Sequence, residues 1–310
     1  MKDLDLTTLR YFVAVCETGN ISRAAEQEHV VPSAISKRLA QMESDFGVPM
    51  LQRQRRGVSP TTAGENLLEH SRAILSSAQR IAQDMASFGA GIRGQVRLLA
   101  TVSSIAESVP DDVAAFMKQP EHREIQVDIQ EALSREILRR VREGSASVGI
   151  LWDAADLEGL ASTPYRTDHL AVVAHASHPL AKRRRCSFEE SLQYEHVGLD
   201  PSSAVNVMLA RAAAIAGKRV IYRAMVSNFE ASLRVVRANL GISIIPMEVA
   251  TSYAVALDLR IVPLTDAWAK RRFAICYRDK QSLSKAAALL VEFLAAAARR
   301  PAGSNGRSRR

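Results

Sequence analysis

In the first 47 residues, residues that end or begin helices recur at such short intervals that this segment can form only short helices joined by tight turns. Apolar residues recur there at the three- and four-residue steps of a buried helical face. Gly19 stands where a left-handed residue ends a helix, Asn20 can cap the next one, and Pro32 fits the first turn of a third. The sequence therefore predicts helices over residues 6–18, 21–28 and 32–45.

The third of these helices has an exposed polar face. Ile35, Leu39 and Met42 are spaced i, i+4, i+7 and form its buried side, which leaves serines and basic residues on the other sides. Two helices joined by a tight turn, the second with a free polar face, form the helix-turn-helix arrangement of DNA-binding proteins. A short basic hairpin over residues 51–60 follows, and Gly57 can take its turn. We therefore predict an N-terminal, all-α winged helix-turn-helix domain.

A long helix is predicted directly after the hairpin. Over residues 62–88 apolar or small residues alternate at steps of four and three, which is the spacing of a coiled-coil seam. Such a helix pairs with a second copy of itself, and a homodimer suits DNA sites with two-fold symmetry. The alternative is a helix packed on its own domain. The seam residues are Leu67, Ser71, Ile74, Ala78, Ile81, Met85 and Phe88.

From residue 95 onward, strand patterns alternate with helix patterns, which is typical of parallel sheets covered by helices. The pattern of Ser227 and Glu230 predicts a capping box, and glycines fall at three expected helix ends. The expected strands are 95–100, 125–130, 147–151, 169–175, 219–226, 242–245, 259–262 and 272–278. The expected helices are 109–118, 134–143, 203–216, 228–238, 247–254 and 282–298.

The net charge of +8 suits a nucleic-acid partner but does not establish one. Five arginines and no acid lie in residues 299–310, a Pro-, Gly- and Ser-rich tail that we expect to be disordered. Residues 1–60 contain eight basic and seven acidic side chains, a net of only +1. The prediction of DNA binding therefore depends on where the basic residues lie.

Other classes of protein are disfavoured by the motifs the sequence lacks. It shows no secretory signal and no run of about 18 apolar residues, so we expect a cytosolic protein without a membrane partner, not a transporter's solute-binding protein. No GxSxG, HExxH or P-loop motif occurs, so we expect no enzyme and no cofactor. Residues 89–94 spell GxGxxG, but after a helix and before a strand, which indicates a linker.

Metal and disulfide chemistry are not expected either. The cysteines Cys16, Cys186 and Cys276 are far apart, which favours reduced thiols. His175 and His178 are three residues apart on or beside an expected strand, without further ligand spacing, so no metal site is predicted.

Residues 9–68 closely resemble, nearly without gaps, the DNA-binding region of LysR-type transcriptional regulators. The distinctive parts are S-R-A-A at 22–25, S-A-I-S-K-R-L at 33–39, residues 43–49 around F-G-V, and T-T-A-G at 61–64. Further on, H-P-L at 178–180 and G-I-S-I-I-P at 241–246 resemble recurring segments of that family's effector domain. The resemblance is strong in the first third of the chain and looser after residue 95.

This resemblance implies dimers or tetramers that bind interrupted inverted repeats in double-stranded DNA near promoters, with RNA polymerase as a candidate partner. It also implies an α/β, type 2 periplasmic-binding-like sensor whose two lobes close on a small co-inducer. The implied domains are a winged helix-turn-helix at 1–61, a linker and dimerisation helix at 62–91, an effector-binding domain at 92–298 and the basic tail at 299–310. Lobe 1 is expected at 92–164 and 268–298, and lobe 2 at 165–267.

Carried onto this chain, the resemblance assigns DNA contacts to the recognition helix and the wing. Lys and Arg side chains can reach guanine edges or phosphates, serines can bond phosphates or bases closely, and wing arginines can enter the minor groove. The family's usual Ser-Gln before this helix is replaced by Val31 and Pro32, so a common hydrogen-bonding Gln is missing. The alternative is a solvated charged face. The assigned residues are Pro32, Ser33, Ser36, Lys37, Arg38, Arg53 and Arg56.

The effector is expected in the cleft at the strand ends, where helix N-termini offer N–H groups to anions. Hydroxyl-rich turns precede three expected helices, which favours a small carboxylate or other anion. No Arg is placed unmistakably in the cleft, so an uncharged ligand stays open, and these residues could instead be plain helix caps. The expected lining residues are Thr101, Ser103, Ser202 and Asn228, with Trp152 nearby. Connections near residues 163–167 and 262–271 are expected to cross between the lobes as a hinge.

Overall fold

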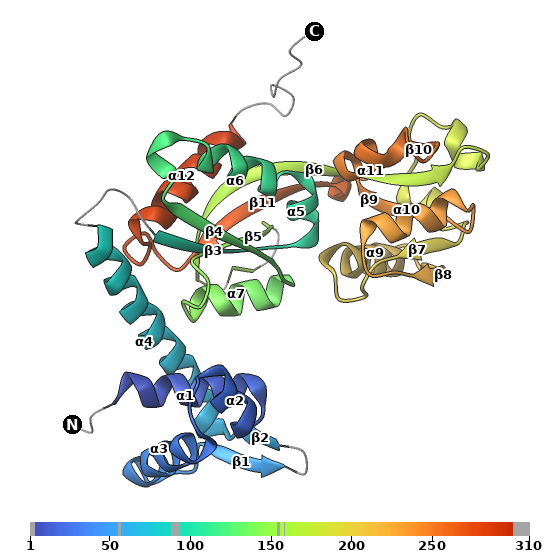
Figure 1. Ribbon diagram of the computed structural model, residues 1–310. Coiled ribbons are helices and arrows are strands. Elements are labelled where there is room, and N and C mark those ends of the chain that lie inside the picture. The colour runs from blue at the N-terminus through green and yellow to red at the C-terminus, as the bar shows by residue number, and fades with distance from the viewer. Residues whose placement is uncertain (1–3, 55–56, 88–93, 154–155, 158, 300–310) are drawn as a thin grey trace.

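The computed structural model describes residues 4–54, 57–87, 94–153, 156–157 and 159–299 (Figure 1). A small helical domain is followed by the long helix α4 and then by a larger α/β domain with two lobes. This arrangement agrees with the predicted fold class. Phe88, most of the predicted GxGxxG linker and residues 300–310 of the predicted tail lie outside the described residues.

The N-terminal domain consists of three short helices and a hairpin. Gly19 ends the first helix with a φ of +63°, and the side chain of Asn20 accepts hydrogen bonds from the backbone N–H groups of Ser22 and Arg23. Both caps are placed as the sequence predicts. The elements are α1 (Leu6–Thr18), α2 (Ile21–Gln27), α3 (Pro32–Phe46), β1 (Leu51–Gln54) and β2 (Gly57–Pro60). Their shared core includes Leu9, Phe12, Ala25, Ile35, Leu39 and Met42.

The hairpin formed by β1 and β2 is held against the turn after α1. The N–H of Val58 donates to the carbonyl oxygen of Gly19 at 2.9 Å. A Cβ atom on Gly57 would lie 2.3 Å from that oxygen, and the φ of Gly57 is +132°, so only glycine fits there. The hairpin, which is the predicted wing, is thereby fixed relative to α1.

Helix α4 (Thr62–Ser87) has two different halves. Leu67, Leu68 and Leu75 pack against the core of the N-terminal domain. Further along, Ile81 is 63% exposed and Met85 is 60% exposed. The first half therefore packs on its own domain, and the second half leaves seam residues uncovered, so pairing with a second copy stays a prediction for that half.

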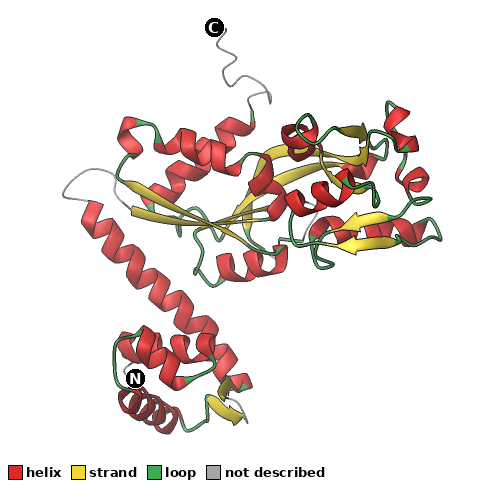
Figure 2. Ribbon diagram, turned by 45° about the vertical axis from the view of Figure 1, so that its right-hand side comes forward, coloured by secondary structure: helices red, strands yellow, loops and turns green. Residues whose placement is uncertain are grey.

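A mixed sheet extends through both lobes in the strand order β10-β6-β11-β5-β3-β4, with β9 also paired to β6 (Figure 2). β3 is parallel to β4 and β5, whereas β11 is antiparallel to β5 and β6. The sheet is thus not wholly parallel, since β11 returns to lobe 1 after lobe 2 is built. The strands are β3 (Gly94–Ala100), β4 (Ile125–Glu131), β5 (Val148–Trp152), β6 (Ala161–His175), β9 (Ser243–Pro246), β10 (Leu259–Pro263) and β11 (Lys270–Tyr277).

Strand β6 carries the chain from lobe 1 into lobe 2. Up to His169 it pairs with β11, and from Leu170 it pairs with β9 and then β10. Residues 163–167, where the sequence predicts a crossing, therefore belong to lobe 1, and the change of partner comes a few residues later. The return connection lies between β10 and β11, within the predicted 262–271.

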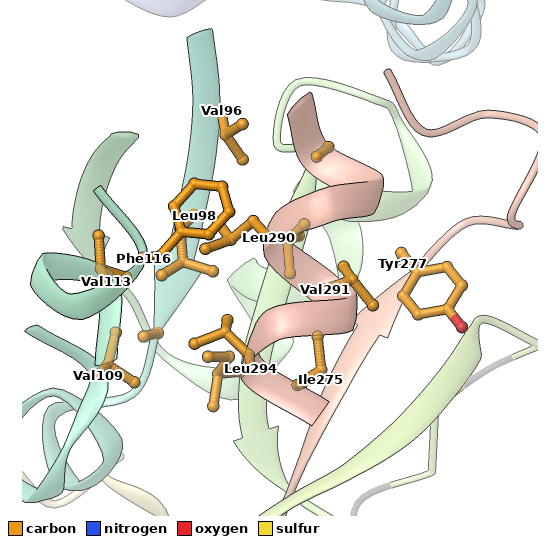
Figure 3. Close-up of a cluster of buried hydrophobic side chains, with 14 of the residues drawn as sticks. Val96, Leu98, Val109, Val113, Phe116, Ile275, Tyr277, Leu290, Val291 and Leu294 are labelled. Atoms are coloured by element: carbon orange, nitrogen blue, oxygen red, sulfur yellow. The ribbon is translucent and has the colours of Figure 1, made fainter. Parts of the chain in front are cut away.

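Lobe 1 has helices on both faces of its part of the sheet. Figure 3 shows α12 laying Leu290 and Leu294 against Leu98 of β3 and Phe116 of α6 in one apolar core. The helices are α5 (Val102–Glu107), α6 (Val109–Met117), the 3-10 helix η1 (Pro120–His122), α7 (Ser134–Arg142) and α12 (Lys285–Ala298). Of these, α5 was not expected from the sequence.

Lobe 2 adds a parallel pair, β7 (His196–Gly198) and β8 (Tyr222–Met225), beside β9. Its helices are α8 (Phe188–Ser191), α9 (Ala204–Ile215), α10 (Phe229–Arg237) and α11 (Met247–Ala254), with the 3-10 helices η2 (Pro179–Lys182) and η3 (Ala267–Ala269). Among the described residues, no helix combines the length and apolar character needed to cross a membrane.

Candidate DNA-binding surface and effector site

The polar side of α3 is open to solvent. Ser33, Ser36 and Lys37 are exposed, and none of them has a hydrogen-bond or ion-pair partner among the described residues. Val31 at the N-cap provides no side-chain hydrogen bond. Pro32 has no N–H and the Ala34 N–H donates to the carbonyl of Val31 at 3.0 Å, so the Ser33 N–H is the backbone donor without a partner here among the described residues. This end of α3 therefore presents hydroxyl, ammonium and backbone donors together, which is the set of groups that phosphates and base edges accept.

Arg38, also assigned to DNA contact, has a partner within the domain. Its Nη1 lies 2.6 Å from Oδ2 of Asp5, and both side chains are about half exposed. Asp5 is the N-cap of α1, and a hydrogen bond from the Thr8 hydroxyl is the main cause that lowers its pKa. An exposed pair of this kind contributes only about 0–1 kcal/mol. The pair can therefore give way to a phosphate at little cost.

The wing places Arg53 in β1, with its backbone opposite Val58. The side chain of Arg53 and the whole of Arg56 lie outside the described residues.

A cavity of about 320 Å³ lies between the two lobes, and we call it the interlobe cavity. It is within the usual size range of small-molecule sites. Lobe 1 contributes residues 101–103, after β3, and 131–134, at the end of β4. Lobe 2 contributes residues 199–200 and 203–205, after β7, and residue 227, after β8. The walls thus come from the strand ends where a ligand of open α/β lobes is expected.

The cavity wall offers hydrogen-bond donors without partners. Ser103 is only 4% exposed, and its hydroxyl has no hydrogen-bond partner among the described residues. Helix α7 begins in the wall at Ser134, and the preceding Leu133 provides no side-chain cap. Helix α9 begins there at Ala204, where the Ser203 hydroxyl accepts from Asn206 N at 3.3 Å. The cavity can therefore hydrogen-bond a polar ligand from both lobes.

Two family models together match most of the chain. The "Bacterial regulatory helix-turn-helix protein, lysR family" model matches residues 6–65, and the "LysR substrate binding domain" model matches residues 89–299. The chain belongs to the LysR family of transcriptional regulators. Because the matched family consists of DNA-binding regulators with effector-binding domains, the expectation that the chain is not an enzyme is supported.

Known proteins similar to this LysR-type regulator include full-length regulators and an isolated effector-binding domain. The RuBisCO operon transcriptional regulator of Allochromatium vinosum is 26% identical over 302 residues, covering 96% of this chain and 97% of its own. The crystal structure of full-length CbnR complexed with its target DNA has a TM-score of 0.67 at 23% identity, covering 94% of this chain and 99% of that one. The effector-binding domain of QuiR, solved with shikimate, has a TM-score of 0.59 at 18% identity, covering 66% and 97%.

Of the five predicted effector residues of this regulator, two line the interlobe cavity and three do not. Thr101 and Ser103 line the interlobe cavity. The Ser202 hydroxyl bonds Asp200, Asn228 caps α10 by accepting from Ala231 N at 2.9 Å, and Trp152 packs against the core of lobe 2. None of these last three is among the cavity-lining residues, although Ser203 and Ser227 beside two of them are.

Sequence reasoning overlooked the lining residues at the end of β4 and after β7. Glu131 and Asp200 are the charged residues among them, and Leu133, Ser134 and Leu199 complete these segments. The sequence contained a signal for both segments. Residues 131–134 directly follow an expected strand, and residues 199–200 directly follow the short apolar run that forms β7, so both lie at strand ends where ligands bind.

The crossing between the lobes contains a buried ion pair. Nε of Arg271 in β11 lies 2.8 Å from Oδ1 of Asp168 in β6, and the two side chains are 1% and 0% exposed. Nearby, Oε2 of Glu107 is buried and has no hydrogen-bond partner in the described part of the chain. Burial, followed by the charges of Asp168 and Glu248, raises the pKa of Glu107 to about 8. At neutral pH the crossing therefore contains this ion pair beside a mostly protonated carboxyl group.

The DNA-binding domain, α4 and lobe 1 meet at one guanidinium group. Nη2 of Arg72 in α4 lies 3.0 Å from Glu17 of α1, and its Nη1 lies 3.0 Å from Glu143, which follows α7. The Arg72 and Glu143 side chains are only 13% and 8% exposed. One helical turn on, the Ser76 hydroxyl donates to the carbonyl of Gly144. We call this contact the Arg72 junction.

Proposed function

We propose that this LysR-type regulator binds interrupted inverted repeats as a dimer or tetramer, and that a small molecule with an anionic group, held in the interlobe cavity, modulates this binding. The observation that carries the proposal is Ser103, a buried residue whose hydroxyl has no partner among the described residues and which lines the cavity beside the starts of α7 and α9. Helix N-termini and free hydroxyl donors favour a carboxylate or another anion. The working units are the domains 1–61, 62–91 and 92–298.

DNA recognition is assigned to α3 and the wing. Ser33, Ser36 and Lys37 lie on one exposed face without partners in the described part of the chain, so they can bond DNA without breaking an internal contact. Pro32 starts the same helix, Arg38 lies one residue beyond Lys37, and Arg53 and Arg56 would reach the adjacent groove from the wing.

The proposed regulation is a population shift. A ligand that contacts both lobes favours the closed arrangement, and closure changes the position of lobe 1 at the Arg72 junction. If the ligand changes the affinity for DNA, DNA must change the affinity for the ligand by the same factor. RNA polymerase is a further candidate partner at the promoter.

Selection of sheared genomic DNA by the purified protein tests this function. Wild type should enrich a few interrupted palindromes, and Ser36→Ala with Lys37→Ala should weaken binding to them by at least about tenfold, since a good base contact is worth roughly 1–3 kcal/mol. Lys182→Ala, which removes the same charge from exposed η2, is the control and should leave the enrichment unchanged. Salt-sensitive, sequence-blind binding that survives the double substitution would mean that the basic tail binds DNA, and the proposal would fail.

A further inference from the structure

The charge of the interlobe cavity is acidic on both walls. Glu131 comes from lobe 1 at the end of β4, and Asp200 comes from lobe 2 after β7. Among the described residues that line the cavity, these two are the charged ones, and no Lys, Arg or His is present. The wall therefore pairs hydrogen-bond donors for an anion with two carboxylates that repel one.

Neither carboxylate has an ion-pair partner among the described residues. Glu131 is exposed and has no ion-pair or hydrogen-bond partner within the described residues. Asp200 accepts hydrogen bonds from the hydroxyl and the N–H of Ser202, and these bonds lower its pKa. Both bonds fall on Oδ1, which leaves Oδ2 available to another donor. Two carboxylates thus line the same space from opposite lobes.

We infer that the effector is a zwitterion, a small molecule with an ammonium group for Glu131 and Asp200 and a carboxylate for the Ser103 hydroxyl and the helix starts. This inference rests on the proposed function, because it describes the ligand of the same cavity. Ser103 is the independent observation that points to a ligand. It is more than nine-tenths buried, it lines the cavity, and its hydroxyl has no hydrogen-bond partner among the described residues. An anion alone would bring a third negative charge to this space.

The placement of the acids also links ligand class to closure. When the lobes approach, Glu131 and Asp200 come nearer to each other, and two carboxylates in a shrinking cavity repel. An ammonium group between them removes that repulsion, whereas a ligand without one does not. A ligand shifts an equilibrium only by its difference in affinity for the two states, so the cationic group is what couples binding to closure.

The other residues of the cavity wall indicate the chemical character of the rest of the ligand. Val102, Leu133, Leu199 and Val205 are apolar lining residues. A cavity of about 320 Å³ with this lining suits an amino acid or a close derivative with an apolar side chain.

Isothermal titration of the full-length protein against three matched sets of compounds tests the inference. The sets are apolar L-amino acids, their N-acetyl derivatives, which lose the cation, and their amides, which lose the anion. We expect an amino acid to bind, with at least about tenfold weaker binding of its N-acetyl derivative and of its amide. Glu131→Gln and Asp200→Asn should each weaken the binding of that amino acid by at least tenfold and should improve the binding of the N-acetyl derivative.

Both substitutions should keep the fold intact, because Glu131 has no partner to lose among the described residues and Asp200→Asn retains the Oδ1 acceptor for Ser202. Glu121→Gln, on exposed η1, is the matched control and should bind like wild type. If N-acetyl derivatives bind wild type as tightly as the amino acids, or if no set binds, the zwitterion inference is overturned. The DNA-selection experiment is independent of these compounds, so a failure here is distinguishable from a failure of the proposed function.

Discussion

At the scale of single residues, His196 shows how burial changes the behaviour of one side chain. It lies at the start of β7 and is 1% exposed, with Nδ1 3.0 Å from the carbonyl of Tyr194 and Nε2 3.4 Å from the Ser191 hydroxyl. Burial lowers its pKa from 6.5 to about 4. Between these two values, the unfolded chain takes up a proton that the folded chain does not accept.

Wild type should therefore lose stability relative to a His196→Gln variant as the pH is lowered from 7.5 to 5, while the raised pKa of Glu107 contributes in the opposite direction to both proteins. Because the folded-state pKa lies below the unfolded one, this part of the stability is complete above pH 6.5, and about 2 kcal/mol of it is lost by pH 5. Urea titrations followed by the fluorescence of Trp152 and Trp268 measure the loss. His196→Gln should lack it, whereas His175→Gln should keep it. An equal loss in the His196 variant would assign the effect to other groups.

At the scale of elements, most boundaries could be predicted because local signals determine them. Gly19, Asn20 and Pro32 lie at helix ends, and α11 has the predicted bounds. The first half of β6 was missed because Pro164 and alternating charged residues interrupt its apolar pattern, and its pairing with β11 is a long-range contact. For the same reason the cavity lining was predicted only in part, since a sequence shows which residues follow a strand but not which neighbour turns into the cleft.

The second half of α4 belongs to the same scale. Ile81 and Met85 lie four residues apart, and both are more than half exposed, so a second copy of the helix can cover them. Ile81→Asp with Met85→Asp should convert the dimer to monomers and weaken binding to a palindromic site by at least about tenfold. Sedimentation equilibrium gives the mass. Val255→Asp, at a 95% exposed position in lobe 2, controls for the added charge. An unchanged mass for the double variant would exclude α4 as the dimer contact.

At the scale of the whole molecule, the Arg72 junction is the place where the orientation of the sensor can reach the DNA-binding domain. Glu143 also pairs with Arg139 at 2.8 Å, so the chain of charges runs from α1 through α4 into α7. The Arg72–Glu143 pair has little solvent contact, and such a charged hydrogen bond is worth about 1.5–3 kcal/mol, whereas Glu17 and Arg139 are almost half exposed and their pairs add less. That is enough to select one arrangement of the domains over others.

Arg72→Met keeps the length of the side chain and removes both ion pairs. We expect the secondary structure to be unchanged, while small-angle X-ray scattering of the free protein shows a larger radius of gyration because lobe 1 is released from α4. Arg234→Met, which breaks an exposed pair on α10, should scatter like wild type. Superimposable curves for the Arg72 variant and wild type would show that the junction does not hold the domains together.

The position of β11 also determines the order in which the regulator can be built during synthesis. Lobe 1 begins with β3, but β11 lies between β5 and β6 in its sheet, and α12 brings Leu290 and Leu294 into its core. Lobe 2 can therefore fold on the ribosome before the central strand of lobe 1 has been synthesised. A nascent chain that ends before residue 270 presents β5 and β6 with unpaired edges, which readily accept strands from other chains. A premature stop there would yield an aggregating fragment instead of a shorter regulator.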